Sequence, residues 1–278
     1  MILALLSVAL ATPLHKPEVV GFGDSWTDDG KGSFVLTNGA WPPSYYYQGR
    51  FSNGPVWIEY YSKMTSSALT DFATGGATYD SSLVQGYTGA NGDVPAPAVK
   101  DQILKYLPTN NKKVDYFVLA GGNDYFFGIS NGITPVQVVS KAAADVQLLL
   151  PTARSVVVLN LPPLAPLPYF GGASTPTAQL FAQYGQWHNG NLTAAFKNEK
   201  KVHVFDLYTV IQKLISSGEY ILDSCVNATT SAVCSQPEKY MYWDQFHFTT
   251  TIHQKIAKAV EDWKCAIGSH SNIVGSRK

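Results

Sequence analysis

A serine near one end of the chain and an acid–histidine pair near the other could together make an activated hydroxyl nucleophile. Ser25 follows the apolar run Val19–Phe22, which indicates a short buried strand, so the serine should lie where a strand gives way to a loop or helix. Asp244 and His247 are close enough in sequence to meet across one helical turn or a tight loop. A histidine oriented by an acid can take the proton of a serine hydroxyl, and such triads are recognised by geometry rather than by sequence order. The leading hypothesis is a serine hydrolase that acts on an ester.

Length and composition restrict the class of protein. The chain has 278 residues, of which 45% are hydrophobic, so it can bury the core of one large α/β domain and is not a disordered protein. Twenty basic residues balance 20 acidic ones without a long run of Lys or Arg, which gives no electrostatic footprint for a nucleic-acid partner. Only 14% of the residues are charged, and tyrosine and tryptophan are plentiful. This composition suits a ligand that stacks on aromatic rings, although buried tyrosines would give the same count.

The start of the chain resembles an export signal. Ile2–Ala11 is an apolar run too short to span a bilayer, and its last residues fit a small-residue cleavage site. The run is shorter than an ordinary signal and has no Lys or Arg before it, so a truncated gene model or a merely hydrophobic N-terminus stays open. We expect a secreted, extracellular monomer without stable membrane insertion. Its expected parts are a signal peptide at 1–11, a single hydrolase domain at 17–266 and a flexible C-terminal tail at 267–278.

Cysteines and glycosylation sequons agree with that compartment. Cys225 and Cys234 bracket a polar segment of the kind that a short disulfide pins down, and we expect a bond between them. The third cysteine, Cys265, is expected to be a small buried hydrophobic residue. N-glycosylation sequons begin at Asn191 and Asn227, although such triplets also arise by chance. No Cys-x-x-Cys or His-x-x-x-His spacing predicts a metal site, and no cofactor is expected.

Apolar strand-like runs alternate with helix-like runs, which predicts an α/β fold. The expected architecture is a three-layer sandwich with a central parallel sheet of about five strands, and ligands should bind beyond the carboxyl ends of those strands. The expected strands are Val19–Phe22, Leu69–Ala73, Tyr116–Ala120, Ser155–Leu159 and Val202–Asp206. The expected helices are Pro55–Lys63, Pro135–Leu150, Ala178–Lys197 and Thr250–Ala266.

Three motifs should meet at one edge of this sheet. Ser25, the pair Gly75-Gly76 and Asn123 each come just after an expected strand. Taken alone, each has a plainer explanation: a surface hydroxyl or helix cap, a backbone requirement, and an Asx turn. Because they fall in compatible places together, we prefer the catalytic interpretation. The aromatic insert at 32–51 and the loop at 86–98 should form the walls of the crevice.

Four ordered blocks between about Val19 and Trp263 resemble the GDSL, or SGNH, esterases and lipases. The blocks are Gly23-Asp24-Ser25-Trp26, Ala73-Thr74-Gly75-Gly76-Ala77-Thr78, Gly121-Gly122-Asn123-Asp124 and Asp244-Gln245-Phe246-His247. Segments 49–54 and 160–163 also resemble stretches of secreted fungal and plant members. Any one block alone would be weak evidence, whereas four in order are specific. The resemblance implies the flavodoxin-like architecture of SGNH hydrolases.

The resemblance also implies a role for each matching residue. Ser25 would be the nucleophile, His247 the general base, and Asp244 the acid that orients the histidine. The oxyanion hole would consist of the backbone N–H groups of Ser25 and Gly76 and the side-chain amide of Asn123, and losing one such donor costs roughly 3–4 kcal/mol of transition-state stabilisation. Water would then hydrolyse the acyl-enzyme.

Two positions depart from the family pattern. Trp26 stands where the namesake motif has leucine, which should change the packing beside the nucleophile more than the chemistry. Asp71 stands where many relatives have asparagine, and the sequence assigns it no role.

The substrate is less determined than the reaction. A small-molecule, carbohydrate or lipid ester would serve, and the leading hypothesis is an acetyl esterase that acts on carbohydrates, because the aromatic segment Trp41–Tyr47 could stack on sugar rings. The same segment could line an acyl-chain groove in a lipase or phospholipase-type acylhydrolase. A catalytically silent sugar-binding protein on the same fold also stays open.

Overall fold

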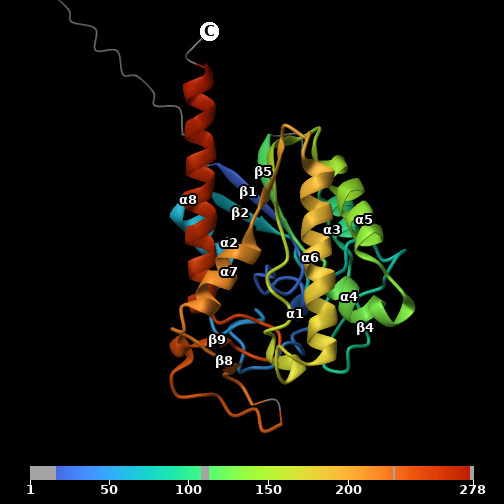
Figure 1. Cartoon of the computed structure of the whole chain (residues 1–278), viewed down its shortest axis with the longest axis vertical. Coiled ribbons are helices and arrows are strands. Elements are labelled where there is room, and N and C mark those ends of the chain that lie inside the picture. The colour runs from blue at the N-terminus through green and yellow to red at the C-terminus, as the bar shows by residue number, and fades with distance from the viewer. Residues whose placement is uncertain (1–16, 108–112, 228, 276–278) are drawn as a thin grey trace, which may run out of the picture.

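The computed structural model describes residues 17–107, 113–227 and 229–275, with side chains described as far as residue 267. Its centre is a five-stranded, wholly parallel sheet with the order β2-β1-β5-β6-β7 (Figure 1). The strands are β1 (Glu18–Gly23), β2 (Ala68–Asp71), β5 (Val114–Leu119), β6 (Ala153–Leu159) and β7 (Val202–Phe205). The five predicted strands and the three-layer α/β architecture are confirmed. The predicted signal peptide lies outside the described residues.

Helices cover both faces of the sheet (Figure 1). One layer contains α2 (Trp57–Met64), α7 (Leu207–Ser216) and α8 (Thr250–Gly275), and the other contains α3 (Val99–Tyr106), α5 (Pro135–Leu149) and α6 (Pro176–Phe196). Every residue of the central strand β5 is therefore buried. Burial on both faces explains why the strand sequences are nearly continuous apolar runs instead of alternating ones.

Shorter elements surround the carboxyl ends of the strands. They are α1 (Ser33–Leu36), α4 (Gly122–Gly128), the antiparallel pair β3 (Tyr87–Thr88) and β4 (Val94–Pro95), the parallel pair β8 (Ile221–Ser224) and β9 (Tyr240–Tyr242), and the 3-10 turns η2 (Ile129–Asn131), η3 (Pro168–Phe170) and η4 (Pro237–Lys239). The strand order reverses between β1 and β5, and such a switch point opens a crevice beyond the strand ends. Ser25 lies in the turn after β1, and Asn123 lies at the start of α4, which follows β5. These two positions carry Ser25 and Asn123.

Side-chain caps fix where several helices begin. Thr134 precedes α5 and accepts a hydrogen bond from the N–H of Gln137, whose side chain accepts the N–H of Thr134 in return at 3.0 Å. Pro135 occupies the first turn, where its missing N–H costs nothing. Helix α6 also begins with a threonine cap and a proline, since Thr175 accepts the N–H of Ala178 and Pro176 follows it, two residues earlier than predicted. The Thr-Pro pair was a start signal that the apolar pattern alone did not reveal.

The structure corrects the predicted end of the last helix. The backbone of α8 is helical as far as Gly275, although a tail was expected from residue 267. The segment has no proline, and an established helix extends by one hydrogen bond per added residue. Cys265 is exposed on α8 and was wrongly predicted to be buried. The inward stripe of this helix runs through Ile256 and Val260 and continues at Trp263, which leaves the cysteine on the outer face.

The predicted disulfide between Cys225 and Cys234 is present. It closes a hairpin that contains an antiparallel bridge between Val226 and Val233. The backbone N–H groups of Cys225 and Val226 donate to the carbonyls of Tyr242 and Trp243, at 3.0 and 2.8 Å. The disulfide hairpin is thereby fastened to the end of β9, immediately before Asp244.

Candidate active site

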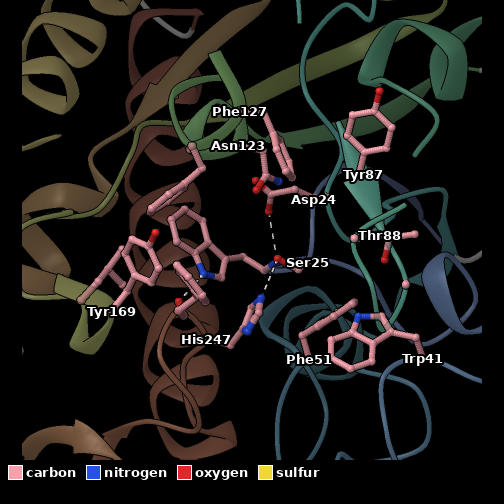
Figure 2. Close-up of a pocket in the computed structure, with 18 residues that line it drawn as sticks. Asp24, Ser25, Trp41, Phe51, Tyr87, Thr88, Asn123, Phe127, Tyr169 and His247 are labelled. Carbon is pink, nitrogen blue, oxygen red and sulfur yellow. Dashed lines mark hydrogen bonds between the residues drawn. The ribbon is translucent and has the colours of Figure 1, made fainter. Parts of the chain in front are cut away.

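The structure brings Ser25, His247 and Asp244 into one hydrogen-bonded chain. The Nε2 atom of His247 lies 2.9 Å from the hydroxyl of Ser25 (Figure 2), and its Nδ1 atom lies 2.6 Å from Oδ2 of Asp244. The serine comes from the turn after β1, whereas the other two residues lie between β9 and α8. The imidazole can therefore take the serine proton at one nitrogen while the carboxylate fixes its other nitrogen as N–H.

The segment that carries the acid and the histidine is a tight loop closed by its own hydrogen bonds. Oδ1 of Asp244 accepts the backbone N–H groups of Phe246 and His247, both at 2.7 Å. The N–H of Trp243 donates to the carbonyl of His247 at 2.6 Å. Burial raises the pKa of Asp244, but the histidine and the hydrogen bonds to the carboxylate outweigh it and hold the pKa below its usual range. Asp244 is therefore ionised and can stabilise an imidazolium.

Ser25, the candidate nucleophile, sits in a tight turn that backbone and carboxyl groups hold. The N–H of Asp24 donates to the carbonyl of Leu119 at 3.2 Å, and Oδ1 of Asp24 accepts the N–H of Trp26 at 3.0 Å. Asp24 therefore closes the turn that carries Ser25. Burial raises its pKa to about 7, although the hydrogen bond from Trp26 opposes this shift. A full negative charge is thus disfavoured directly beside the nucleophile.

Trp26 links the nucleophile turn to the histidine loop. Its indole N–H donates to the carbonyl of Phe246 at 3.1 Å, and its ring stacks on Phe248 with centroids 5.9 Å apart. Leucine could make neither the hydrogen bond nor the stacking contact. The departure from the namesake motif therefore changes how two catalytic segments are joined.

Three potential oxyanion donors line the same cavity. Among the described residues, no protein group accepts the backbone N–H of Ser25 or of Gly76. The side-chain amide of Asn123 donates one N–H to the carbonyl of Ala77 at 3.0 Å, which ties the start of α4 to the loop that contains Gly75 and Gly76. The second N–H of the amide is left for a ligand. Gly76 has a φ of +83°, and a Cβ there would lie 2.0 Å from the carbonyl oxygen of Tyr87. Only glycine fits this position.

Asp28 joins the segment that follows Ser25 to the loop that contains Gly75 and Gly76. Sequence reasoning missed this role. The fully buried carboxylate of Asp28 accepts four backbone N–H groups at 2.9–3.0 Å, from Gly30, Gly32, Ser33 and Gly75. Burial raises its pKa, and these four bonds oppose that rise. The Asp28 carboxylate therefore positions the residue next to Gly76, 47 residues away along the chain.

Asp71, which the sequence left without a role, braces the same region. Its two oxygens accept the N–H groups of Asp29 and Ala73, each at 3.1 Å. β2 is an edge strand, and the N–H groups of Phe72 and Thr74 still donate to the carbonyls of Gly21 and Gly23 beyond its end, at 2.9 and 3.0 Å. A Cβ on Gly21 would lie 2.5 Å from Oδ1 of Asp71, so the carboxyl packs directly on β1. Burial, followed by repulsion from Asp29, raises the pKa of Asp71 well above its usual value.

A cavity of about 390 Å³ opens beside the triad. As predicted, the insert and the loop contribute to its walls, through Trp41, Phe51, Tyr87 and Thr88. Figure 2 shows these side chains on one side of Ser25 and Tyr169 on the other. Sequence reasoning missed the remaining apolar lining, which consists of Phe126, Phe127, Leu167, Tyr169 and Phe246.

Replacing Asn123 with alanine should lower kcat by about 10²–10³-fold, because one donor to the developing oxyanion is lost. KM should change little, since the oxyanion forms only in the transition state. Steady-state rates on a p-nitrophenyl ester would measure both constants. Asn131→Ala, an exposed asparagine on η2 that does not line the cavity, is the matched control. An unchanged kcat for Asn123→Ala would remove the amide from the oxyanion hole.

The other predicted site residues lie away from the triad. Asn227 is exposed in the disulfide hairpin, where its side chain accepts the N–H groups of Thr229 and Thr230. Asn191 is half-buried within α6 and donates to the carbonyl of Trp187 at 2.7 Å. Glycosylation at both remains a prediction, and the exposed turn at Asn227 suits it better. In the described part of the chain, no cluster of three or more His, Cys, Asp or Glu side chains could hold a metal ion.

Two further histidines are buried and structural. Nδ1 of His188 bonds to the hydroxyl of Tyr125 at 2.9 Å, and Nδ1 of His253 accepts the backbone N–H of Trp57 at 3.2 Å. Burial lowers the pKa of each to about 3. Neither histidine lines the cavity, so His247 is the imidazole positioned to act on Ser25.

Comparison with known proteins gives a family and a fold. Residues 19–260 match the family model described as GDSL-like Lipase/Acylhydrolase. The chain is 25% identical over 275 residues to the thermolabile hemolysin of Vibrio parahaemolyticus, covering 90% of this chain and 64% of that protein. It is 23% identical over 321 residues to the phosphatidylcholine-sterol acyltransferase of Aeromonas hydrophila, covering 92% and 93%. The chain thus spans less than two thirds of the hemolysin's length.

A solved structure agrees with this fold. A carbohydrate acetylesterase from Sinorhizobium meliloti superposes with a TM-score of 0.54 at 15% identity, over 91% of this chain and 100% of that one. At this identity the likeness concerns the fold alone.

Proposed function

Since the chain belongs to the GDSL-like lipase/acylhydrolase family and is a serine ester hydrolase, we propose that it cleaves carboxylic esters through an acyl-enzyme on Ser25. The observation that carries this proposal is the hydrogen-bonded chain from the hydroxyl of Ser25 through His247 to Asp244, at the wall of a cavity. A hydroxyl, a base within hydrogen-bond reach of it and an acid that orients the base are what nucleophilic catalysis requires.

The reaction would proceed in two halves. Oγ of Ser25 attacks the ester carbonyl carbon while Nε2 of His247 takes the hydroxyl proton. The N–H groups of Ser25 and Gly76 and the amide of Asn123 receive the oxyanion. The intermediate collapses, the leaving alcohol takes the proton from His247, and the acyl group stays on the serine. Water then attacks this ester with His247 as its base, and the carboxylic acid leaves while the serine regains its proton.

We further propose that the acyl group is longer than acetyl. The cavity of about 390 Å³ lies in the size range of sites for small organic ligands. The lining contains the carboxyl group of Asp24 and the imidazole of His247, both at the reaction centre, and otherwise consists mainly of aromatic and glycine residues. Each buried methylene contributes about 0.8 kcal/mol, whereas each buried sugar hydroxyl would need a hydrogen-bond partner. This lining supports an acyl chain more than the sugar that the sequence favoured.

The carbohydrate acetyl esterase is the second candidate. The rings of Trp41, Tyr87 and Tyr169 lie in the cavity lining and could stack on a sugar. An acetyl group would leave most of the cavity for the alcohol part of the ester. The two candidates therefore differ in which side of the ester the aromatic walls hold.

We also propose that the protein is secreted. The disulfide between Cys225 and Cys234 is of a kind that persists in oxidising compartments. The apolar run at the N-terminus and the exposed sequon at Asn227 support the same location. Among the described helices, none has both the length and the apolar character needed to cross a membrane.

We expect kcat/KM on p-nitrophenyl octanoate to exceed that on p-nitrophenyl acetate by at least about tenfold, because burying only two additional methylenes would supply the necessary free energy. Initial rates on both esters, with Ser25→Ala as the blank, measure this ratio. Phe127→Ala, which removes one wall of the cavity, should reduce the rate on octanoate more than that on acetate. A preference for acetate would reject the long acyl chain and favour the acetyl esterase.

A further inference from the structure

Tyr46 makes a hydrogen bond to the triad acid that the family motifs do not contain. Its hydroxyl donates to Oδ2 of Asp244 at 2.5 Å, and the same oxygen lies 2.6 Å from Nδ1 of His247. The tyrosine is buried and does not line the cavity. It therefore contacts the catalytic machinery from behind, away from the space open to a substrate.

The direction of this hydrogen bond is fixed by the chemistry of the pair. Burial, followed by the negative charge of Asp244, raises the pKa of Tyr46 far above its usual value, so the phenol keeps its proton. The carboxylate can only accept. Both oxygens of Asp244 are then fully engaged: Oδ2 has the phenol and the imidazole, and Oδ1 has the N–H groups of Phe246 and His247, with Nδ1 of the imidazole also 2.9 Å away. The carboxylate cannot rotate without losing a charge-assisted bond.

Packing holds the phenol in place. The ring of Tyr46 meets those of Trp243 and Phe51 edge-on, at centroid distances of 6.3 and 6.2 Å. Its buried cluster also contains Cys225 and Val226 of the disulfide hairpin. Phe51 in turn lies 4.9 Å from the ring of His247. The rings of Tyr46, Trp243 and Phe51 therefore form one cluster. It contacts the disulfide hairpin, Asp244 and His247.

We propose that Tyr46 is a positioning residue of the triad, which sets the orientation and the basicity of His247 by holding the carboxylate of Asp244. This inference rests on the proposed function. A donor on Oδ2 withdraws charge from that oxygen and so weakens its attraction for an imidazolium. Without the phenol, the imidazole should hold its proton to higher pH and should also be less well oriented.

Tyr46→Phe tests this role, because it removes the hydroxyl and keeps the ring. We expect kcat at the pH plateau to fall about tenfold, as for the loss of one hydrogen bond to a charged group. The acidic limb of the pH–rate profile should move to higher pH by about half a unit or more. KM should stay unchanged, because Tyr46 does not line the cavity.

Tyr45→Phe is the matched control, since this neighbouring ring packs 4.9 Å from that of Tyr46 and has no hydrogen bond to Asp244. It should leave both kcat and the acidic limb unchanged. Tyr46→Leu removes the hydroxyl in a side chain of another shape and should move the limb in the same direction. In an Asp244→Asn background, Tyr46→Phe should cost little further activity, because the two residues act through one bond.

An unmoved acidic limb in Tyr46→Phe and Tyr46→Leu, with only a lower Tm, would overturn the positioning role. Additive losses in the double variant would overturn it as well. A failure of the proposed function is distinguishable, since Ser25→Ala would then keep its turnover whatever the tyrosine variants do.

Discussion

Ser25→Ala should lower kcat by roughly 10⁵-fold on any ester that the enzyme cleaves. Removing a triad nucleophile abolishes the acyl-enzyme route, and only binding and oxyanion stabilisation remain. The fold should survive, because the turn is held by backbone and Asp24 hydrogen bonds that alanine keeps. Initial rates on p-nitrophenyl octanoate, together with the Tm from circular dichroism, measure both effects.

The control for this variant is Ser130→Ala, an exposed serine on η2 outside the cavity lining. It should keep the activity of the parent enzyme. A Ser25→Ala variant that retained more than about one hundredth of kcat would contradict the nucleophile assignment, because loss of a triad member costs far more than this.

Asp244→Asn should lower kcat by about 10⁴-fold, the effect of forcing a triad histidine into the wrong tautomer. In Asp244→Asn, an N–H₂ group replaces one carboxylate oxygen. If the remaining oxygen accepts from both Nδ1 of His247 and the hydroxyl of Tyr46, the N–H₂ group must face the backbone N–H groups of the loop, which are donors as well. The asparagine also carries no charge to stabilise the imidazolium. Steady-state kcat and KM on the octanoyl ester would measure the loss, which should fall mainly on kcat.

Asp223→Asn, on the exposed strand β8, is the matched control and should be neutral. If Asp244→Asn stayed within tenfold of the parent kcat, the acid would have no role in orienting the base. The proposal for Tyr46 would then also fall, because that residue acts through Asp244.

The fold was largely predictable because its information is local. The five strands of the main sheet contain short runs of apolar residues, and their observed ends lie within two residues of the predicted ones. The errors arise where a polar side chain competes with the backbone pattern. Asp206 was assigned to a strand but caps α7, where it accepts the N–H of Thr209 at 3.1 Å. Such a cap is visible only when the next helix is recognised.

The candidate site was predictable only in the parts that its sequence blocks mark. Ser25, Gly76, Asn123 and His247 follow from the blocks and from the shared edge of a parallel sheet. Tyr46 could not be found in this way, because it is 198 residues from Asp244 and lies in a run of three tyrosines with no distinguishing neighbour. Contacts of this kind are set by tertiary packing rather than by local spacing.

The supporting carboxylate and the cavity walls were hidden for related reasons. Asp28 has the sequence context of an ordinary turn residue, and its four donors come from two separate loops. Phe126 and Phe127 follow a strand within α4, where aromatic residues usually indicate core. That both of them contribute to a cavity wall depends on how α4 lies beside the switch point of the sheet.

The acyl group of the substrate should pass through a covalent bond to Ser25. A p-nitrophenyl alkylphosphonate tests it most directly, because attack by the nucleophile expels p-nitrophenol and leaves a stable phosphonyl ester on the attacking oxygen. Peptide mass spectrometry then locates the adduct. We expect a single phosphonyl group on the peptide that contains Ser25, no labelling of Ser25→Ala, and much slower labelling of His247→Ala. An adduct on another residue, or equal labelling of Ser25→Ala, would show that Ser25 is not the nucleophile.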